Sequence, residues 1–284
     1  MFAEQYSPQE MMAAVCAMEI HNDDVAFVGI GIPMMAGLIA AKTHAPNATL
    51  VYEAGGVGAK SRRLPLTISD NPTTENAIFA TEMWRIFSDT QAGFIDKGII
   101  GGAQVDRYGN INTNVILGNG TYDRPKVRLP GTGGANDIAS SCGETIIMMK
   151  LVKGKFVNKV DFISAPGHLH GYDSRQKAGL KGGGPSKMVT DKGIFLFDPE
   201  SKEMYLSAVF PGEDPLEIKT YFEWDLKIAD HLECLEPPTQ EVIDIIHYYD
   251  QDGMILGGKK TMDTEFEAYY QKMKANYTAI ELNL

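Results

Sequence analysis

One carboxylate and the glycines beside it form the first pattern that could do chemistry in this chain of 284 residues. Glu53 follows a strand-forming run, residues 49–52, and precedes the glycine-rich residues 54–58. In an open parallel sheet, ligands bind in the crevice at the carboxyl ends of the strands. A glutamate there would be held rigidly, and the glycines would let a ligand approach closely. The position predicts a functional carboxylate, with an ordinary loop glutamate as the alternative.

A second pattern is the loop at residues 131–137, which has the sequence G-T-G-G-A-N-D. If its glycines adopt the required dihedral angles, several backbone N–H groups point into one small space. Such a nest holds an oxyanion or a phosphate. The alternative is a tight turn before the next element. An acid at a strand end and a loop rich in N–H donors together predict acyl chemistry.

A shorter motif, Gly29-Ile30-Gly31, follows the apolar run at residues 25–28. It lacks the full G-x-G-x-x-G pattern of dinucleotide-binding loops, and Pro33 stands where the packing helix would begin. We therefore expect a turn between a strand and a helix here, in preference to a nicotinamide or flavin site. The sequence also contains no G-x-x-x-x-G-K-[ST], which excludes an ordinary P-loop.

Histidines and cysteines offer weaker candidates. His168 and His170 would share one face of a strand, but no third ligand follows at a recognisable spacing. We expect hydrogen-bonded loop histidines and no metal site, and we expect Cys142 to be a packed small residue rather than a nucleophile. The three cysteines are odd in number and form no C-x-x-C, which favours a reducing compartment over a disulfide framework.

The elements around these candidates predict a β-α-β unit with a parallel sheet. Ser7 and Glu10 have the spacing of a capping box at a helix start. A strand at residues 25–29, a helix that ends near Lys42 and a strand at residues 49–52 follow in order. The next stretch, residues 60–96, is rich in loop signals and in aromatic side chains.

The second half of the chain is richer in predicted strands. They fall at residues 97–104, 111–117, 145–149, 161–164, 187–190, 194–197 and 204–209. Asp191-Lys192-Gly193 is a hairpin turn signal, and residues 239–249 have helical periodicity. The pattern predicts an α/β fold: a single three-layer domain on an open sheet, with a β-rich second half. We expect this domain to cover residues 1–250, with a helical tail at residues 251–284.

The charge balance limits the kinds of partner. The chain has 26 Lys and Arg against 37 Asp and Glu, a formal net charge of −11. Nucleic acids and anionic membranes need a concentrated basic surface, and no basic run is longer than Arg62-Arg63. The N-terminus has no positively charged segment, and no apolar run approaches the length of a membrane span. We expect a cytoplasmic protein that binds neither nucleic acid nor membrane.

With these motifs in place, the sequence resembles the class I CoA-transferases, most closely the β subunit of the glutaconate CoA-transferase type, over about residues 7–250. Four stretches carry the resemblance in the same order. They are GGAQVDRYGNIN at residues 101–112, GTGGAN at 131–136, SAPG at 164–167 and VTDKG at 189–193. The resemblance implies a fold of the CoA-transferase type, which is Rossmann-like.

The resemblance also implies roles for the first two patterns. Glu53 matches the family's strand-end nucleophile, although Tyr52 and Ala54 replace the usual Val and Ser on either side of it. The family's glycine-rich oxyanion loop maps onto Gly131, Gly133, Gly134 and Ala135. We also expect Gly29 and Gly31 to belong to the oxyanion and CoA-binding set. CoA is then a substrate, and no cofactor is bound permanently.

In such enzymes the active site lies between two different subunits, so the resemblance implies a separate α subunit of the same fold. The substrates would be an acyl-CoA and a carboxylic acid, joined through a glutamyl-CoA thioester at Glu53. Relatives with this fold also act as acyl-CoA hydrolases that open rings or as decarboxylases, and either reaction is an alternative here. A non-catalytic subunit that binds acyl-CoA is the third possibility.

Overall fold

The computed structural model of this protein describes residues 1–251, 253, 255 and 256. Its centre is one sheet of ten strands, all of which run in the same direction except β3 and β12. From edge to edge the strands are β14 (Lys227–Cys234), β13 (Met204–Val209), β12 (Gly193–Phe197), β11 (Pro185–Val189), β10 (Glu144–Met148), β5 (Lys97–Ile100), β1 (Val25–Val28), β2 (Thr49–Val51), β3 (Gly56–Val57) and β4 (Phe79–Ala80). The predicted open, mostly parallel sheet is confirmed.

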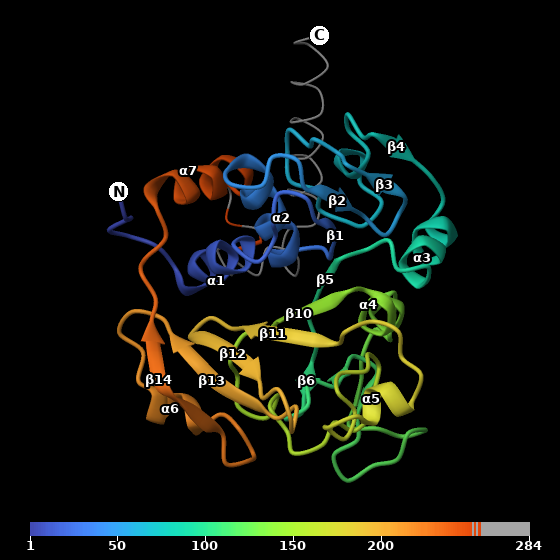
Figure 1. The fold of residues 1–284 in the computed structure, drawn as a ribbon, viewed down its shortest axis with the longest axis vertical. Helices are drawn as coiled ribbons and strands as arrows, with labels where there is room; N and C mark the ends of the chain where they lie inside the picture. The colour runs from blue at the N-terminus through green and yellow to red at the C-terminus, as the bar shows by residue number, and fades with distance from the viewer. Residues whose placement is uncertain (252, 254, 257–284) are drawn as a thin grey trace.

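Helices cover the sheet on both faces, as Figure 1 shows. They are α1 (Pro8–Ala17), α2 (Ile32–Lys42), α3 (Met83–Gln91), α4 (Ala135–Ser141), α5 (Ser174–Lys177), α6 (Pro215–Lys219), α7 (Gln240–Tyr249) and the short 3₁₀ helix η1 (Asn71–Thr73). Two small sheets lie outside the main one: β6 (Gln104–Val105) with β7 (Ile111–Asn112), and β8 (Val115–Ile116) with β9 (Val127–Arg128).

Two hydrophobic cores make the fold three-layered. One core joins α1, α2 and α7, through buried side chains such as Met12, Met35 and Ile243. The other lies across the sheet and includes Ile86 of α3 and Ile138 of α4. Because each apolar face is buried against the sheet, the three-layer prediction is confirmed.

The first elements form where local signals predicted them. Ser7 accepts a hydrogen bond from the Glu10 N–H, and the Glu10 carboxylate accepts one from the Ser7 N–H, so both halves of the capping box are present. The strand β1, the helix α2 and the parallel strand β2 then form the predicted β-α-β unit. Thr239 likewise caps α7 through its side chain.

Three predictions about individual elements were wrong. The stretch at residues 60–96 contains α3, which was missed because only Ile86 and Thr90 of that helix are buried. The strand predicted at 111–117 is broken into β7 and β8, because the Asn112 side chain accepts the N–H groups of Asn114 and Val115 and turns the backbone. No strand forms at residues 161–164.

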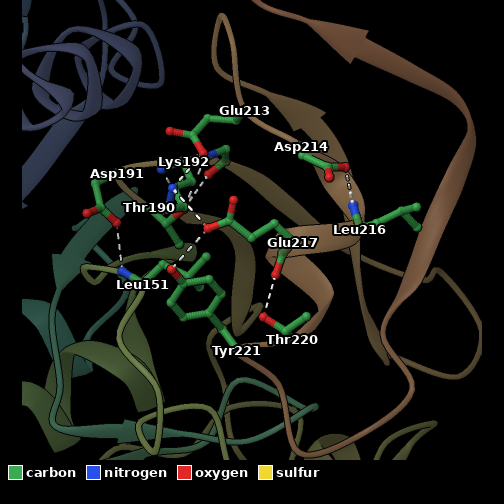
Figure 2. A network of polar contacts seen from close by, with 11 residues as sticks. Leu151, Thr190, Asp191, Lys192, Glu213, Asp214, Leu216, Glu217, Thr220 and Tyr221 are labelled. Atoms are coloured by element: carbon green, nitrogen blue, oxygen red, sulfur yellow. Dashed lines mark hydrogen bonds and ion pairs between the residues drawn. The ribbon is translucent and has the colours of Figure 1, made fainter.

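The hairpin predicted at Asp191-Lys192-Gly193 is confirmed, since β11 and β12 pair antiparallel around it. Figure 2 shows how its polar groups are used. The Thr190 hydroxyl accepts the Lys192 N–H, and the Asp191 carboxylate accepts the Leu151 N–H at 2.7 Å. The Lys192 ammonium lies 2.6 Å from the Glu213 carboxylate. The β-rich second half therefore begins with a turn whose charges are paired.

The division of the chain into residues 1–250 and a tail stays a prediction. The predicted helical tail, residues 251–284, lies outside the described residues except for residues 251, 253, 255 and 256. The described part ends just after α7, with residues 255 and 256 packed against the core that α7 shares with α1 and α2.

Candidate active site

Glu53 lies at the carboxyl end of β2, in the tight turn that leads to β3. The Gly55 N–H donates to the Tyr52 carbonyl at 3.0 Å, and the Tyr52 N–H donates to the Gly56 carbonyl at 2.9 Å. Gly55 has a φ of +118°, and a Cβ there would lie 1.7 Å from the Thr81 carbonyl oxygen. Glycine is required at Gly55 because this turn packs backbone against backbone. The turn thus holds Glu53 rigidly.

The Glu53 carboxylate is half-buried and unpaired. Among the described residues, no donor gives it a hydrogen bond and no cation forms an ion pair with it. Burial alone raises its pKa above the ordinary value of 4.5. A carboxylate without a partner in a partly dry environment is a stronger base and nucleophile than one that is fully solvated.

The glycine-rich loop reaches the same place from the other side of β1. Gly134 immediately precedes α4, and a Cβ at Gly134 would lie 3.2 Å from the Glu53 Oε1. The same Cβ would lie 2.5 Å from Cζ of Phe87. The structure therefore brings together the two sequence patterns, Glu53 and the loop at residues 131–135. It also adds Phe87, which sequence reasoning did not place in the site.

The loop presents free N–H groups. Gly131 and Gly133 have positive φ angles, +115° and +53°, and open space lies where their side chains would be. The Gly131 N–H donates to the Thr113 carbonyl and the Ala135 N–H to the Thr132 carbonyl. The N–H groups of residues 132–134 donate to no other described residue. Of the predicted loop positions, Gly133 and Gly134 therefore have N–H groups with no acceptor among the described residues, and their role toward a ligand stays a prediction.

A hydrogen-bond network ties the glycine-rich loop at residues 131–135 to neighbouring segments of the chain. The Asn114 side-chain oxygen accepts the Thr132 hydroxyl at 2.8 Å and the Ser164 hydroxyl at 2.6 Å. The Ser164 hydroxyl in turn accepts the Thr113 N–H at 2.8 Å. This network joins the GTGGAN and SAPG motifs. The two motifs lie far apart along the chain, and no sequence pattern predicted that they would be in contact.

Gly29 and Gly31 form the predicted turn between strand and helix. They follow β1, which pairs in parallel with β2, so their loop and Glu53 both lie at the carboxyl ends of these neighbouring strands. Gly31 is the N-cap of α2 with a φ of +90°, and a Cβ at Gly29 would lie 3.3 Å from the Ile99 carbonyl oxygen. Their role toward CoA stays a prediction.

Tyr52, the residue before Glu53, packs away from the turn. The Tyr52 side chain, which replaces the usual Val, is buried in the core beneath α1, α2 and α7. The preceding Val51 belongs to the opposite core, as the alternation of a strand requires. The Tyr52 ring therefore packs into the helical layer and leaves the turn around Glu53 intact.

The histidine and cysteine candidates take part in hydrogen bonding and packing. The His168 ring contacts the Pro185 carbonyl at 2.9 Å, and burial lowers the pKa of His168 to about 4, so this histidine is the expected hydrogen-bonded one. The backbone of His170 donates to the Ser174 hydroxyl. Cys142 is fully buried, which raises its pKa to about 12 and confirms the packed residue. Within the described residues, no group of three or more His, Cys, Asp or Glu could hold a metal ion.

Residues 9–219 match the sequence profile of the family described as Coenzyme A transferase. The chain belongs to the Coenzyme A transferase family, and the predicted family and enzyme class are confirmed.

Particular relatives narrow the comparison. One of them is a subunit of the 3-oxoadipate CoA-transferase of Pseudomonas knackmussii, which is 40% identical over 85% of this chain and 92% of that protein. Another is a subunit of the glutaconate CoA-transferase of Acidaminococcus fermentans, which is 35% identical over 85% of this chain and 91% of that protein.

Solved structures agree on the fold. The crystal structure of the Acidaminococcus fermentans glutaconate enzyme matches with a TM-score of 0.82 at 33% identity, over 90% of this chain and 98% of that chain. The decarboxylase AibA/AibB matches with a TM-score of 0.74 at 19% identity, over 88% of this chain and 97% of that chain, and so shares the fold alone. Among the residues that the structure describes, no helix has the length and apolar character needed to span a membrane.

Proposed function

We propose that this chain is the subunit that carries the nucleophile of a heteromeric CoA-transferase. The enzyme would move CoA between an acyl-CoA and a carboxylic acid through a glutamyl-CoA thioester at Glu53. One observation carries the proposal: the Glu53 carboxylate is half-buried, and its Oε1 lies beside Gly134, in the loop at residues 131–135. Neither the carboxylate nor the N–H groups of Gly133 and Gly134 have a hydrogen-bonding partner among the described residues.

The reaction would begin with attack by the Glu53 carboxylate on the thioester carbonyl of the donor. The C–S bond breaks, CoA leaves as the thiolate, and an acyl-glutamyl anhydride forms. The thiolate then attacks the Glu53 carbonyl of the anhydride, which releases the donor's carboxylate and leaves a glutamyl-CoA thioester. An acceptor carboxylate reverses these two steps, so that CoA leaves on the acceptor and Glu53 is a carboxylate again.

The site residues would lower the barriers of these steps. A carboxylate is a weak nucleophile, so the negative charge that develops on the attacked carbonyl oxygen needs donors. The N–H groups of Gly133 and Gly134 would supply them, an effect of about 3–4 kcal/mol for each well-placed donor. The loop at Gly29 and Gly31, at the adjacent strand end, would contact CoA. CoA is the substrate in this scheme, and no permanently bound cofactor takes part.

The partner would be an α subunit of the same fold. Both similar proteins are named as single subunits of their enzymes, and each is therefore one part of an assembly. Large apolar side chains are exposed on and beside α3: Phe79 is 48% exposed, Trp84 67% and Phe94 66%. They lie close in sequence to Phe87, which contacts the site loop, so a partner covering them would also close the site.

Co-expression with candidate α subunits, followed by size-exclusion chromatography with multi-angle light scattering, tests the assembly. We expect a stable complex that is active, and a chain that is inactive by itself. A monomer with full activity would exclude the partner. A cytoplasmic location for this complex stays a prediction.

Dicarboxylic acids are the first acyl groups to test, because 3-oxoadipate and glutaconate appear in the names of two of the similar enzymes. The complex would be incubated with an acyl-CoA, with and without an acceptor acid. Acyl-CoA of the acceptor, formed only when both substrates are present, supports transfer. Release of CO₂ supports the decarboxylase alternative, and this chain shares the fold of one decarboxylase. Ring opening by hydrolytic cleavage of a C–C bond supports the hydrolase alternative. Binding without any turnover supports a non-catalytic subunit.

A further inference from the structure

Phe87 stands on α3 with its ring directed at the sheet. The ring stacks on that of Phe27 in β1, with 6.0 Å between the centroids and 29° between the planes. Phe27 is 1% exposed, so one face of Phe87 is fixed by the protein core. The half-buried Phe87 thus occupies the space between α3, β1 and the start of α4.

The same ring lies beside the candidate nucleophile. A single point, the Cβ position that Gly134 lacks, lies 2.5 Å from Cζ of Phe87 and 3.2 Å from Oε1 of Glu53. The edge of the ring and the carboxylate oxygen therefore share one small space above Gly134. Since no described residue pairs with the carboxylate, Phe87 is the apolar neighbour of Glu53 that the contacts identify.

The helix that carries Phe87 is tied to the site loop. The Gln91 side chain, one turn further along α3, donates to the Asp137 carboxylate in the first turn of α4 at 2.7 Å. Ile86 is buried in the core beneath both helices. The hydrogen bond and the shared core thus hold α3, which carries Phe87, against α4 and the loop that precedes it.

We propose that Phe87 is a positioning residue that keeps water from the acyl and CoA intermediates on Glu53 and so directs them to transfer instead of hydrolysis. This inference rests on the proposed function. In the competing reaction, water adds to the glutamyl-CoA carbonyl, the C–S bond breaks, CoA leaves with a proton, and Glu53 becomes a carboxylate again. The net reaction is the conversion of acyl-CoA and water to carboxylic acid and CoA. An apolar wall beside the carbonyl suppresses it by excluding the water.

A graded series tests the proposal in the complete enzyme complex: Phe87→Leu, Phe87→Val and Phe87→Ala. Acceptor-dependent transfer and acceptor-independent release of CoA would be measured on the same preparation. We expect the ratio of hydrolysis to transfer to rise as the side chain shrinks, by about tenfold or more in the smallest variant that folds. We also expect the acidic limb of the transfer profile to move to lower pH, because water would then solvate the Glu53 carboxylate.

Phe27→Leu is the matched control, because leucine keeps an apolar contact with the Phe87 ring and removes no atom from the ring edge that lies beside Glu53. We expect it to keep the wild-type ratio and pH profile. The proposal is overturned if the Phe87 series keeps the wild-type ratio, or if Phe27→Leu raises it equally. A wild-type complex that transfers CoA to no acceptor would instead contradict the proposed function, so the two failures are distinct.

Discussion

Two turns at the carboxyl ends of parallel strands in the main sheet differ in how their charged groups are paired. The Glu53 turn follows β2, and the Thr190–Asp191 turn follows β11; each leads from a parallel strand into an antiparallel one. In the second turn, Asp191 accepts the Leu151 N–H and Lys192 pairs with Glu213, as Figure 2 shows. In the first turn, no described residue pairs with Glu53.

The two turns also shift pKa values for opposite reasons. The hydrogen bond to Glu213 raises the pKa of Lys192, which stabilises its charged form. Burial raises the pKa of Glu53, which destabilises its charged form. A paired charge contributes to the fold, whereas an unpaired one costs stability and retains its reactivity. The strand-end position is common to both turns, so the missing partner is what distinguishes the candidate site.

The largest expected effect is that of Glu53→Gln. The amide cannot form the anhydride or the thioester, so we expect transfer to fall by about 10³-fold or more. Stability at neutral pH should be unchanged or slightly higher, since an unpaired carboxylate is removed. Steady-state assays and thermal unfolding of the complex would measure both. Transfer within about tenfold of the wild-type rate would mean that Glu53 is not the nucleophile.

A smaller effect is expected for Gly134→Ala, which adds a Cβ against Phe87 and Glu53. Displacing these groups by about 1 Å should lower kcat by about 10–100-fold, because catalysis depends on their alignment. Gly154→Ala is the control, since Gly154 has open space around it; its φ is +82°, whereas that of Gly134 is −78°, so only the control places an alanine in the left-handed region. We expect that variant to lose some stability and no transfer activity. Equal losses of activity in both variants would show that the contact of Gly134 with Phe87 and Glu53 has no specific role in catalysis.

The raised pKa of Glu53 should affect the pH dependence of both activity and stability. Transfer needs the ionised Glu53 carboxylate, and burial raises its pKa above the ordinary value of 4.5. As the pH is lowered, transfer should therefore begin to fall while the pH is still above 4.5. For stability the sign is reversed: the folded chain holds the Glu53 proton more tightly than the unfolded chain does. The contribution of Glu53 to stability is therefore lost as pH rises from 4.5 through the raised pKa.

Thermal unfolding of wild type and Glu53→Gln across this pH range would measure the stability difference. We expect the variant to gain stability relative to wild type as pH rises. A constant difference would show that the Glu53 carboxylate is solvated in the folded protein.

The smallest effect is expected at the paired turn. Lys192 and Glu213 are each about one-fifth exposed, so their ion pair should contribute about 0.5–1 kcal/mol to the free energy of unfolding. A double-mutant cycle of Lys192→Met and Glu213→Gln would measure this coupling, which high salt should weaken. Transfer activity should stay at the wild-type level. A loss of activity without a loss of stability would assign this turn a role in the reaction.

Local sequence signals predicted much of this arrangement. The capping box at Ser7 and Glu10 and the strand before Glu53 depend on neighbours in sequence, and they were found correctly. The position of Phe87 was not predictable, because α3 buries little of its surface and its contact with Gly134 joins segments far apart in the chain. The contact of Asn114 with Thr132 and Ser164 also escaped, since it joins loops that only the folded chain brings together.

The central claim is that CoA becomes covalently attached to Glu53. The complex would be incubated with an acyl-CoA in the absence of an acceptor, digested, and analysed by mass spectrometry, with and without borohydride. We expect that the peptide containing Glu53 gains the mass of a CoA thioester, that borohydride reduces this adduct, and that Glu53→Gln does not form it. Transfer of CoA by a complex that forms no adduct on this peptide would contradict the claim.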